Sequence, residues 1–389
     1  MSTREKNRLP DREFKVRRQK VQEEVKKRGL DLLLAHSNEA DFANVRYLSD
    51  YWPIFESAGV LVPAEGEPVL LIGPESETFA RDRSRIKKIY KLVEYRESAE
   101  PDYPDIKVST FESIFKEVLP GKKIKKIGLS GYQIFPLPIY ESVKKAAPEA
   151  EIVKNDIVAD LRIIKSPAEL EMLRESFRIS EIALKNTIKQ LKPSMTELQV
   201  VGIIEKEFYS LGAEYEAHPQ YVLAGRSSTH AIGRPGYQKL GRKNLIQLDV
   251  GARVAGYSGS VGRPVCIGKM PPEMRRLVRI GLEIHLKTME WIKAGIIAKD
   301  VTRKFFEYAE KMDVRQNVLY GPCHGLGMIE VERPWMESHS NYHLQENMTF
   351  QVDTFLYNQE FGLRWENGIR VTKNGVEAFS DILQKIIEI

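Results

Sequence analysis

Two aspartates, Asp249 and Asp353, lie within or at the end of apolar runs of strand-like composition, LIQLD and MTFQVD. A lone carboxylate is costly to bury in such a run unless hydrogen bonds or opposite charges compensate it. We therefore expect both carboxylates to have polar partners in the fold.

Candidate partners lie in the same half of the chain. They are His230 in SSTHAIGRPG, His324 in GPCHGLGMIEVERPW, and Arg364 and Glu366 in LRWENGIRVTKNG. The glycines around His324 leave little side-chain bulk beside the imidazole, so a metal, a substrate or another strand can approach it. The first half lacks a comparable cluster of His, Cys and carboxylates, so we expect the chemistry in the second half.

The first half alternates helix and strand patterns. A charged, heptad-like stretch at 11–29 favours a helix, and short apolar runs at 30–36, 59–63, 67–73 and 122–131 favour strands. This pattern is typical of a small α/β domain. We assign it residues 1–160.

A capping box opens the second domain, residues 161–389. Ser166 is followed by Pro167 at the first helical position and by Glu169 three residues later, before a long amphipathic helix. A further helix is expected at 196–212, strands at 219–268, a helix pair around 271–312 and strands again near 348–373. Helices and strands in separate runs indicate an α+β fold.

Composition excludes several classes of protein. The 59 Lys and Arg exceed the 54 Asp and Glu by only 5 over 389 residues, which does not predict binding to nucleic acid. The first residues are charged and no apolar run reaches membrane-spanning length, so no membrane association is expected. Two cysteines suit a reducing compartment, and we predict a cytoplasmic protein.

Four landmarks in order resemble the creatinase, prolidase and methionine aminopeptidase family. They are LRIIKSPAELEML, LDVGARVAGYS, HGLGMIEVERP, and the pair MTFQVD and LRWENGIRVTKNG. The resemblance covers roughly residues 155–389, and the first half looks like the N-terminal domain of creatinases and prolidases. It implies a C-terminal pita-bread domain behind a smaller α/β domain, and a homodimer.

The resemblance also implies a two-ion site of two aspartates, a histidine and two glutamates, from which this chain departs. Asp249, His324 and Glu366 match ligand positions, Asp353 replaces a glutamate, and Ser260 stands where the bridging aspartate belongs. Because bridging carboxylates hold two ions about 4 Å apart, a serine is a poor substitute. We expect either no metal or a single divalent ion. Its ligands would be His324, Asp353 and Glu366, with Asp249 nearby.

Two further departures separate the chain from its relatives. Val331 replaces the second histidine of the HGLG motif, and Gly262 lies where creatinase has a glutamate. Creatine is therefore not the expected substrate.

We interpret the chain as a creatinase-like hydrolase of a C–N bond in a small polar substrate. His230 matches the family's upstream histidine, although two residues farther than usual from Asp249, and would act as general acid and base. Arg364 would neutralise the acidic cluster or hold a substrate carboxylate. The other predicted catalytic residues are His324, Asp353 and Glu366, and the predicted substrate-binding residues are Arg364, Tyr257 and Asp249.

Two alternatives stay open. One is an Xaa-Pro aminopeptidase or dipeptidase with a single metal ion, which would take short peptides. The other is an inactive pita-bread module that binds peptide or protein partners. Retention of His324, Asp353 and Glu366 speaks against the inactive module.

Overall fold

The computed structural model describes residues 7–389 and divides the chain into two compact units. The N-terminal unit is Pro10–Arg162, and the C-terminal unit is Ile163–Ile389 together with the residues up to Leu9. The predicted boundary between residues 160 and 161 lies two residues from this division.

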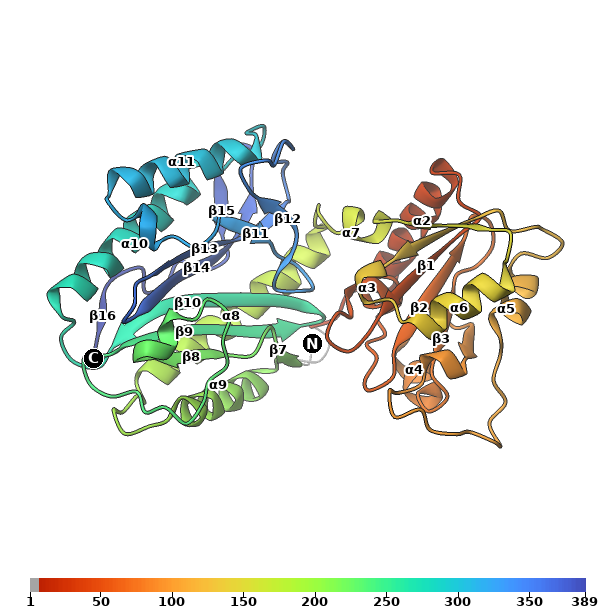
Figure 1. The fold of residues 1–389 in the computed structure, drawn as a ribbon, viewed down its shortest axis with the longest axis horizontal. Coiled ribbons are helices and arrows are strands. Elements are labelled where there is room, and N and C mark those ends of the chain that lie inside the picture. Colours follow the sequence, from red (N-terminus) through yellow and green to blue (C-terminus); the bar gives the residue numbers. More distant parts are fainter. Residues whose placement is uncertain (1–6) are drawn as a thin grey trace. The chain divides into compact units, whose positions relative to one another are not determined.

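The N-terminal unit contains a six-stranded sheet in the order β4-β3-β2-β1-β5-β6 (Figure 1). Its elements are α2 (Asp11–Lys27), β1 (Leu32–Ser37), α3 (Ala43–Ser49), β2 (Ala58–Pro63), β3 (Val69–Ile72), α4 (Glu77–Arg83), β4 (Ile89–Lys91), η1 (Val93–Tyr95), α5 (Phe111–Val118), β5 (Lys126–Ser130), η2 (Tyr132–Ile134), α6 (Leu137–Ala146), β6 (Glu151–Lys154) and α7 (Ile157–Leu161). The predicted strands at 30–36, 59–63, 67–73 and 122–131 are confirmed as β1, β2, β3 and β5.

The central strand β1 is buried on both faces. Leu32 and Leu34 pack in one apolar cluster with Phe111 of α5 and Val143 of α6. Leu33 points to the opposite face, because side chains alternate along a strand, and it is also fully buried. The group of α2, α3 and α7, whose members contact one another, covers that face.

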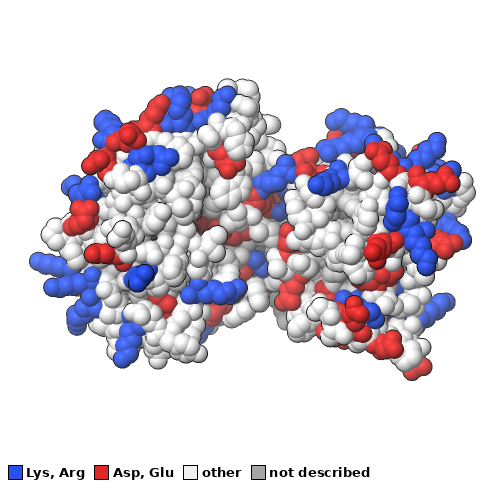
Figure 2. Space-filling model, viewed as in Figure 1, with Lys and Arg blue, Asp and Glu red and all other residues white. Residues whose placement is uncertain are grey.

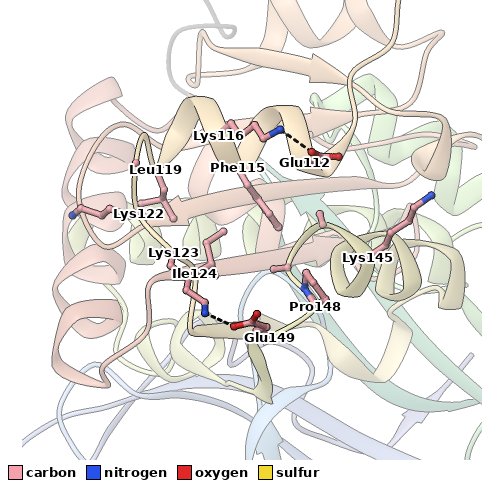
Figure 3. Close-up of a pocket in the computed structure, with 13 residues that line it drawn as sticks. Glu112, Phe115, Lys116, Leu119, Lys122, Lys123, Ile124, Lys145, Pro148 and Glu149 are labelled. Atoms are coloured by element: carbon pink, nitrogen blue, oxygen red, sulfur yellow. Dashed lines mark hydrogen bonds and ion pairs between the residues drawn. The ribbon is translucent and has the colours of Figure 1, made fainter.

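A hollow of about 600 Å³ opens in this unit where α5 and α6 end (Figure 3). Two lysines at its rim are neutralised by glutamates: Lys116 lies 2.7 Å from Glu112, and Lys123 pairs with Glu149. Neither histidine nor cysteine lines it. The hollow therefore offers no imidazole or thiol, and both glutamates that line it are paired with lysines.

The C-terminal unit contains a ten-stranded sheet in the order β12-β11-β13-β14-β10-β9-β7, with β15 paired to β14, β16 to β10 and β8 to β9 (Figure 1). Its elements are α8 (Pro167–Ile188), α9 (Glu197–Leu211), β7 (Tyr215–Glu216), β8 (Tyr221–Ala224), η3 (Gly225–Thr229), β9 (Leu245–Val254), β10 (Tyr257–Cys266), α10 (Pro272–Trp291), α11 (Ala298–Lys311), η4 (Arg315–Asn317), β11 (Cys323–Gly325), β12 (Glu332–Met336), β13 (Thr349–Tyr357), β14 (Gly362–Val371), β15 (Val376–Ala378) and β16 (Ile387–Glu388).

The helix boundaries agree with the sequence signals. The Ser166 hydroxyl accepts from the Glu169 backbone N–H, and the Glu169 carboxylate accepts from the Ser166 N–H, so the predicted capping box is confirmed. Thr196 caps α9, and Gly212 ends it in the left-handed conformation that glycine adopts readily. The predicted α+β architecture is confirmed.

Helices α8 and α10 cover one face of this sheet. A Cβ added at Gly259 of β10 would lie 2.8 Å from the Phe177 backbone nitrogen of α8, so only glycine permits this close packing. On the same face, the Trp365 ring nitrogen of β14 donates to the Val278 carbonyl oxygen of α10 at 3.1 Å. The polar residues of β9, β10 and β14 that point to the opposite face are available for a site.

The surface drawn in Figure 2 carries basic and acidic side chains interspersed, without a large area of one sign. None of the helices in residues 7–389 is both long and apolar enough to cross a membrane.

Candidate active site

Strand register aligns three of the predicted carboxylates. Asp249 of β9 pairs with Gly262 of β10, Gly262 pairs with Glu366 of β14, and Glu366 pairs with Asp353 of β13. Paired residues on neighbouring antiparallel strands project from the same face of a sheet. The row Asp249–Gly262–Glu366–Asp353 therefore places three buried carboxylates on the face opposite α8 and α10.

Gly262 makes room within this row. A Cβ at this position would lie 2.7 Å from the Glu366 Cβ and 3.1 Å from the Arg364 Cγ. Both distances are shorter than ordinary van der Waals contacts between carbon atoms. A larger side chain at residue 262 would therefore displace Glu366 or Arg364.

Arg364 is the cation at the centre of the row. Its Nη1 lies 3.3 Å from Asp249 Oδ2, and its Nε lies 3.2 Å from Asp353 Oδ1 and 3.8 Å from Glu366 Oε2. Its Nη2 donates to the Ala231 carbonyl oxygen at 2.8 Å. The buried guanidinium is thus occupied by the protein, which favours the predicted neutralising role over contact with a substrate carboxylate.

Asp353 is held by a tyrosine that the sequence did not single out. The Tyr320 hydroxyl donates to Asp353 Oδ2 at 2.5 Å and accepts from Arg364 Nη2 at 2.9 Å. Tyr320 lies just before the His324 motif, in LYGPCHG, but nothing in that pattern indicates that it reaches β13. With Arg364 and Tyr320 as its partners, Asp353 is turned toward this pair.

A candidate metal cluster forms with a glutamate in place of Asp353. His324, Glu330 and Glu366 each offer one ligand atom, and these three atoms lie within 4.8 Å of one another. The His324 Nδ1 donates to the Gly325 carbonyl oxygen at 3.1 Å, which leaves Nε2 free to act as a ligand. Glu330 Oε1 is buried without a hydrogen-bond donor. This cluster shares His324 and Glu366 with the predicted ligand set of His324, Asp353 and Glu366, which stays a prediction.

The electrostatics of the row favour a further cation. Burial raises the pKa of Glu366 well above its usual range, and the carboxylates of Asp249 and Glu330 add to this effect. Burial also raises the pKa of Asp353, although Arg364 opposes it. Asp249 differs, because burial raises its pKa but His218, Arg364 and hydrogen bonds, including that from Ser260, together lower it below the usual value. Glu366 therefore favours the protonated form, and a bound cation in place of that proton would relieve the same repulsion.

His218 is a second residue that the sequence did not single out. Its Nε2 lies 2.9 Å from Ser260 Oγ and 3.6 Å from Asp249 Oδ2. Ser260 Oγ in turn donates to Asp249 Oδ1 at 2.5 Å. His218 lies in a short segment between β7 and β8, AEYEAHPQYV, which carries no recognisable motif. We call His218, Ser260 and Asp249 the serine cluster.

Two predicted residues lie apart from these groups. The His230 side chain is exposed, and within the described residues its ring has no hydrogen bond or ion pair. Its backbone N–H donates to the Ser227 carbonyl oxygen at 3.1 Å, and its backbone carbonyl oxygen accepts from Gln247 at 3.3 Å. Tyr257 is fully buried, and its hydroxyl donates to Glu169 of α8 at 2.6 Å, on the sheet face away from the row. None of these hydrogen bonds joins either residue to the row, and the roles predicted for His230 and Tyr257 stay predictions.

The fold and the sequence place the chain in a family of hydrolases. The sequence model of metallopeptidase family M24 matches residues 171–373, more than half of the chain, and that of the creatinase/prolidase N-terminal domain matches residues 17–164. The chain belongs to metallopeptidase family M24. The predicted family, the pita-bread fold and the assignment as a C–N hydrolase are confirmed at this level.

Individual relatives extend over nearly the whole chain. The Xaa-Pro dipeptidase of Pyrococcus horikoshii is 26% identical over 373 residues, which covers 95% of this chain and 97% of that protein. The Xaa-Pro dipeptidase of Pyrococcus furiosus is 23% identical and covers 88% and 92%. The solved X-Pro aminopeptidase of Thermotoga maritima shares the fold, with a TM-score of 0.84 at 22% identity and coverage of 96% and 99%.

Proposed function

We propose that this chain hydrolyses peptide bonds next to proline, with a single divalent ion bound by His324, Glu330 and Glu366. The observation that carries the proposal is this buried cluster of a histidine and two glutamates, in a chain that matches Xaa-Pro dipeptidases over nearly its full length. Short peptides would be the substrates.

The donor atoms fit one ion better than two. Two ligands at about 2.1 Å from one ion are at most about 4.2 Å apart, so atoms within 4.8 Å need to close by only about half an ångström. Asp249 and Asp353, by contrast, already contact Arg364, and Ser260 offers no second carboxylate. When bound, a divalent ion polarises a carbonyl oxygen and lowers the pKa of a bound water.

The surrounding side chains hold the site in shape. Arg364 and Tyr320 orient Asp353, and Gln351 donates to Glu366 Oε1 at 2.5 Å and to the Ser260 carbonyl oxygen at 2.9 Å. These hydrogen bonds tie β13 to β10 and β14 across the row. Hydrogen bonds of this kind hold a carboxylate in the orientation in which it can bind an ion.

The creatinase-like interpretation loses support. The two Pyrococcus relatives that match over most of the chain are named as Xaa-Pro dipeptidases, and the space at Gly262 is too small for the glutamate that creatinase places there. Without room for that side chain, the creatinase substrate site has no counterpart here.

Elemental analysis of protein purified without chelator tests the metal proposal. We expect one ion per chain in the unaltered protein and a strong loss of ion in Glu330→Gln. The matched control Glu337→Gln changes a partly exposed glutamate of the neighbouring segment and should keep the ion. Two ions per chain, or an unchanged ion content in Glu330→Gln, would overturn the assignment.

Substrate preference is tested on the same protein after addition of Mn²⁺, Co²⁺ or Zn²⁺. Ala-Pro and Ala-Pro-Ala are compared with Ala-Ala and Ala-Ala-Ala. We expect hydrolysis of a proline peptide and much slower hydrolysis of its alanine counterpart. Equal rates, or none with any of the three ions, would refute activity at proline.

A further inference from the structure

The side chain of Gln351 has one polar group in use and one without a partner. Its Nε2 donates to the Ser260 carbonyl oxygen at 2.9 Å and to Glu366 Oε1 at 2.5 Å. The atom that makes both contacts must be the nitrogen, because a backbone carbonyl oxygen can only accept. The remaining atom is the carboxamide oxygen, Oε1, which is buried without a hydrogen-bond partner in the described structure. Gln351 therefore places an unused acceptor inside the protein.

Strand register places Gln351 between two residues of the candidate metal cluster. Gln351 of β13 pairs with His324 of β11, and β14, which carries Glu366, lies on the other side of β13. Paired residues of antiparallel strands project from the same face, with their Cβ atoms about 4.5–5.5 Å apart. The Gln351 side chain therefore lies next to His324 and reaches Glu366 diagonally across β14.

The position of Gln351 Oε1 follows from the hydrogen bond of its neighbouring nitrogen. The nitrogen and oxygen of one carboxamide are about 2.3 Å apart, so Gln351 Oε1 lies at most about 4.8 Å from Glu366 Oε1. The ligand atoms of His324, Glu330 and Glu366 lie within the same 4.8 Å of one another. The unused oxygen is thus as close to Glu366 as the members of the candidate metal cluster are to each other.

The acceptors around this point suit a cation. Glu330 Oε1, which lies 3.8 Å from His324 Nε2, is also buried without a hydrogen-bond partner. A buried acceptor that no hydrogen reaches is unfavourable, and a metal ion satisfies it as well as a donor does. One bound ion would satisfy both oxygens.

We propose that Gln351 Oε1 is a fourth protein ligand of the single divalent ion, beside His324, Glu330 and Glu366. This inference rests on the ion site of the proposed function and adds a ligand to it. The two glutamates supply negative charge, and the neutral carboxamide adds an oxygen without further repulsion between carboxylates. A donor set dominated by carboxylate and carbonyl oxygens suits Mn²⁺.

The hydrogen bonds of Nε2 hold the carboxamide ready for this role. Turning the group over would bring Oε1 against the Ser260 carbonyl oxygen, and two acceptors cannot bond to each other. Through Ser260, the same bonds connect Gln351 to the serine cluster. Because the carboxamide is held before an ion arrives, binding orders little more of this side chain.

The affinity of chelator-treated protein for Mn²⁺, measured by isothermal titration calorimetry at pH 8, tests the ligand. Gln351→Leu removes the oxygen and should bind Mn²⁺ about tenfold more weakly, or worse. Gln351→Glu keeps an oxygen at this position and should bind Mn²⁺ at least as tightly as the unaltered protein. The matched control Gln345→Leu changes an exposed glutamine and should leave the affinity unchanged.

The two variants separate a ligand from a residue that only positions Glu366. Both lose the NH₂ group that donates to Glu366, so a purely positioning role predicts that they weaken Mn²⁺ binding alike. Equal weakening in the two variants, or an unchanged affinity in Gln351→Leu, would overturn the proposal.

Electron–nuclear double resonance tests the contact itself, and it decides the question even if Gln351→Leu does not fold. Spectra are recorded on Mn²⁺-loaded, unaltered protein whose glutamines carry ¹³C at the side-chain carboxamide carbon. This carbon lies one bond behind the ligating oxygen, so we expect a strong ¹³C coupling that is missing in Gln351→Glu. Absence of that coupling in the unaltered protein would refute ligation by Gln351.

The two proposals fail in different ways. If the unaltered protein binds no ion, the proposed ion site fails and the fourth ligand fails with it. If the protein binds an ion but cleaves no proline peptide, only the proposed activity fails, and the calorimetric and resonance measurements still decide the role of Gln351. If it binds an ion and cleaves proline peptides while Gln351→Leu keeps its affinity, only the proposal for Gln351 fails.

Discussion

Replacing Arg364 by methionine should destabilise the C-terminal unit strongly. The change removes the buried cation that lies 3.3 Å from Asp249 and 3.2 Å from Asp353. At an effective dielectric constant of about 20, one charge pair at this separation interacts with about 5 kcal/mol. Burying the guanidinium away from water is itself unfavourable and offsets part of this attraction. We therefore expect a net loss of about 3–5 kcal/mol in the free energy of unfolding at neutral pH.

The loss should shrink as the pH falls. In the folded protein, Arg364 and His218 hold the pKa of Asp249 below its usual value, so this carboxylate stabilises the fold above its unfolded pKa and stops doing so as the pH falls through its folded pKa. Without Arg364 the carboxylates take up protons at a higher pH, which relieves their repulsion. The difference between the two proteins is therefore largest at neutral pH and smallest in acid.

Urea denaturation followed by tryptophan fluorescence measures this loss. Three of the four tryptophans, Trp291, Trp335 and Trp365, lie in the C-terminal unit, so the signal reports mainly on that unit. The matched control is Arg174→Met, which removes a partly exposed arginine from its ion pairs and should cost about 0–1 kcal/mol. A loss below about 1 kcal/mol for Arg364→Met, or a difference that grows in acid, would refute the central role of this cation.

Three further predictions concern single features of the fold. Gly262→Ala should cost about 1–3 kcal/mol by overpacking against Glu366, measured by urea denaturation, and a neutral effect would show that the row can relax. Lys165→Met breaks the buried 3.0 Å ion pair with Glu332 and should lower the free energy of unfolding by about 3–5 kcal/mol. Adding Glu332→Leu should restore most of that stability, because it removes the carboxylate left without its partner. If the second substitution restores nothing, the ion pair itself stabilises the fold. Burial lowers the pKa of His36 to about 4, so the unfolded chain binds more protons than the folded chain between about pH 6.5 and 4. As the pH falls across this range, the N-terminal unit should therefore lose about 3 kcal/mol of its free energy of unfolding. His36→Phe should abolish this part of the pH dependence, as measured by thermal unfolding.

Local signals in the sequence predicted the elements well. The capping box of Ser166 and Glu169 and the glycine stop at Gly212 depend on residues a few positions apart, so their geometry is encoded locally. The apolar runs predicted β1, β2 and β3 for the same reason. The carboxylates Asp249 and Asp353 were correctly expected to have partners, because the cost of burying a charge does not depend on the fold.

The composition of the site depended on contacts that no local pattern encodes. The candidate metal cluster contains Glu330, which the sequence did not single out, whereas Asp353 contacts Tyr320 and Arg364. His218 lies far from Ser260 in the sequence, and the antiparallel pairing of β9 with both β7 and β10 brings the two segments together. His230 was selected by order along the chain, which does not determine whether a loop side chain points inward.

The row Asp249–Gly262–Glu366–Asp353 also sets the order in which this protein can mature on the ribosome. Asp249 and Glu366 are 117 positions apart, from residue 249 to residue 366, and they join through a single pairing between β10 and β14. Contacts of such long sequence separation form late and slow folding. While β14 is still being synthesised, Asp249 lacks Arg364 and has only the partners nearer in sequence, His218 and Ser260, among those described above. The row is therefore completed only when the last strands of the sheet have been made.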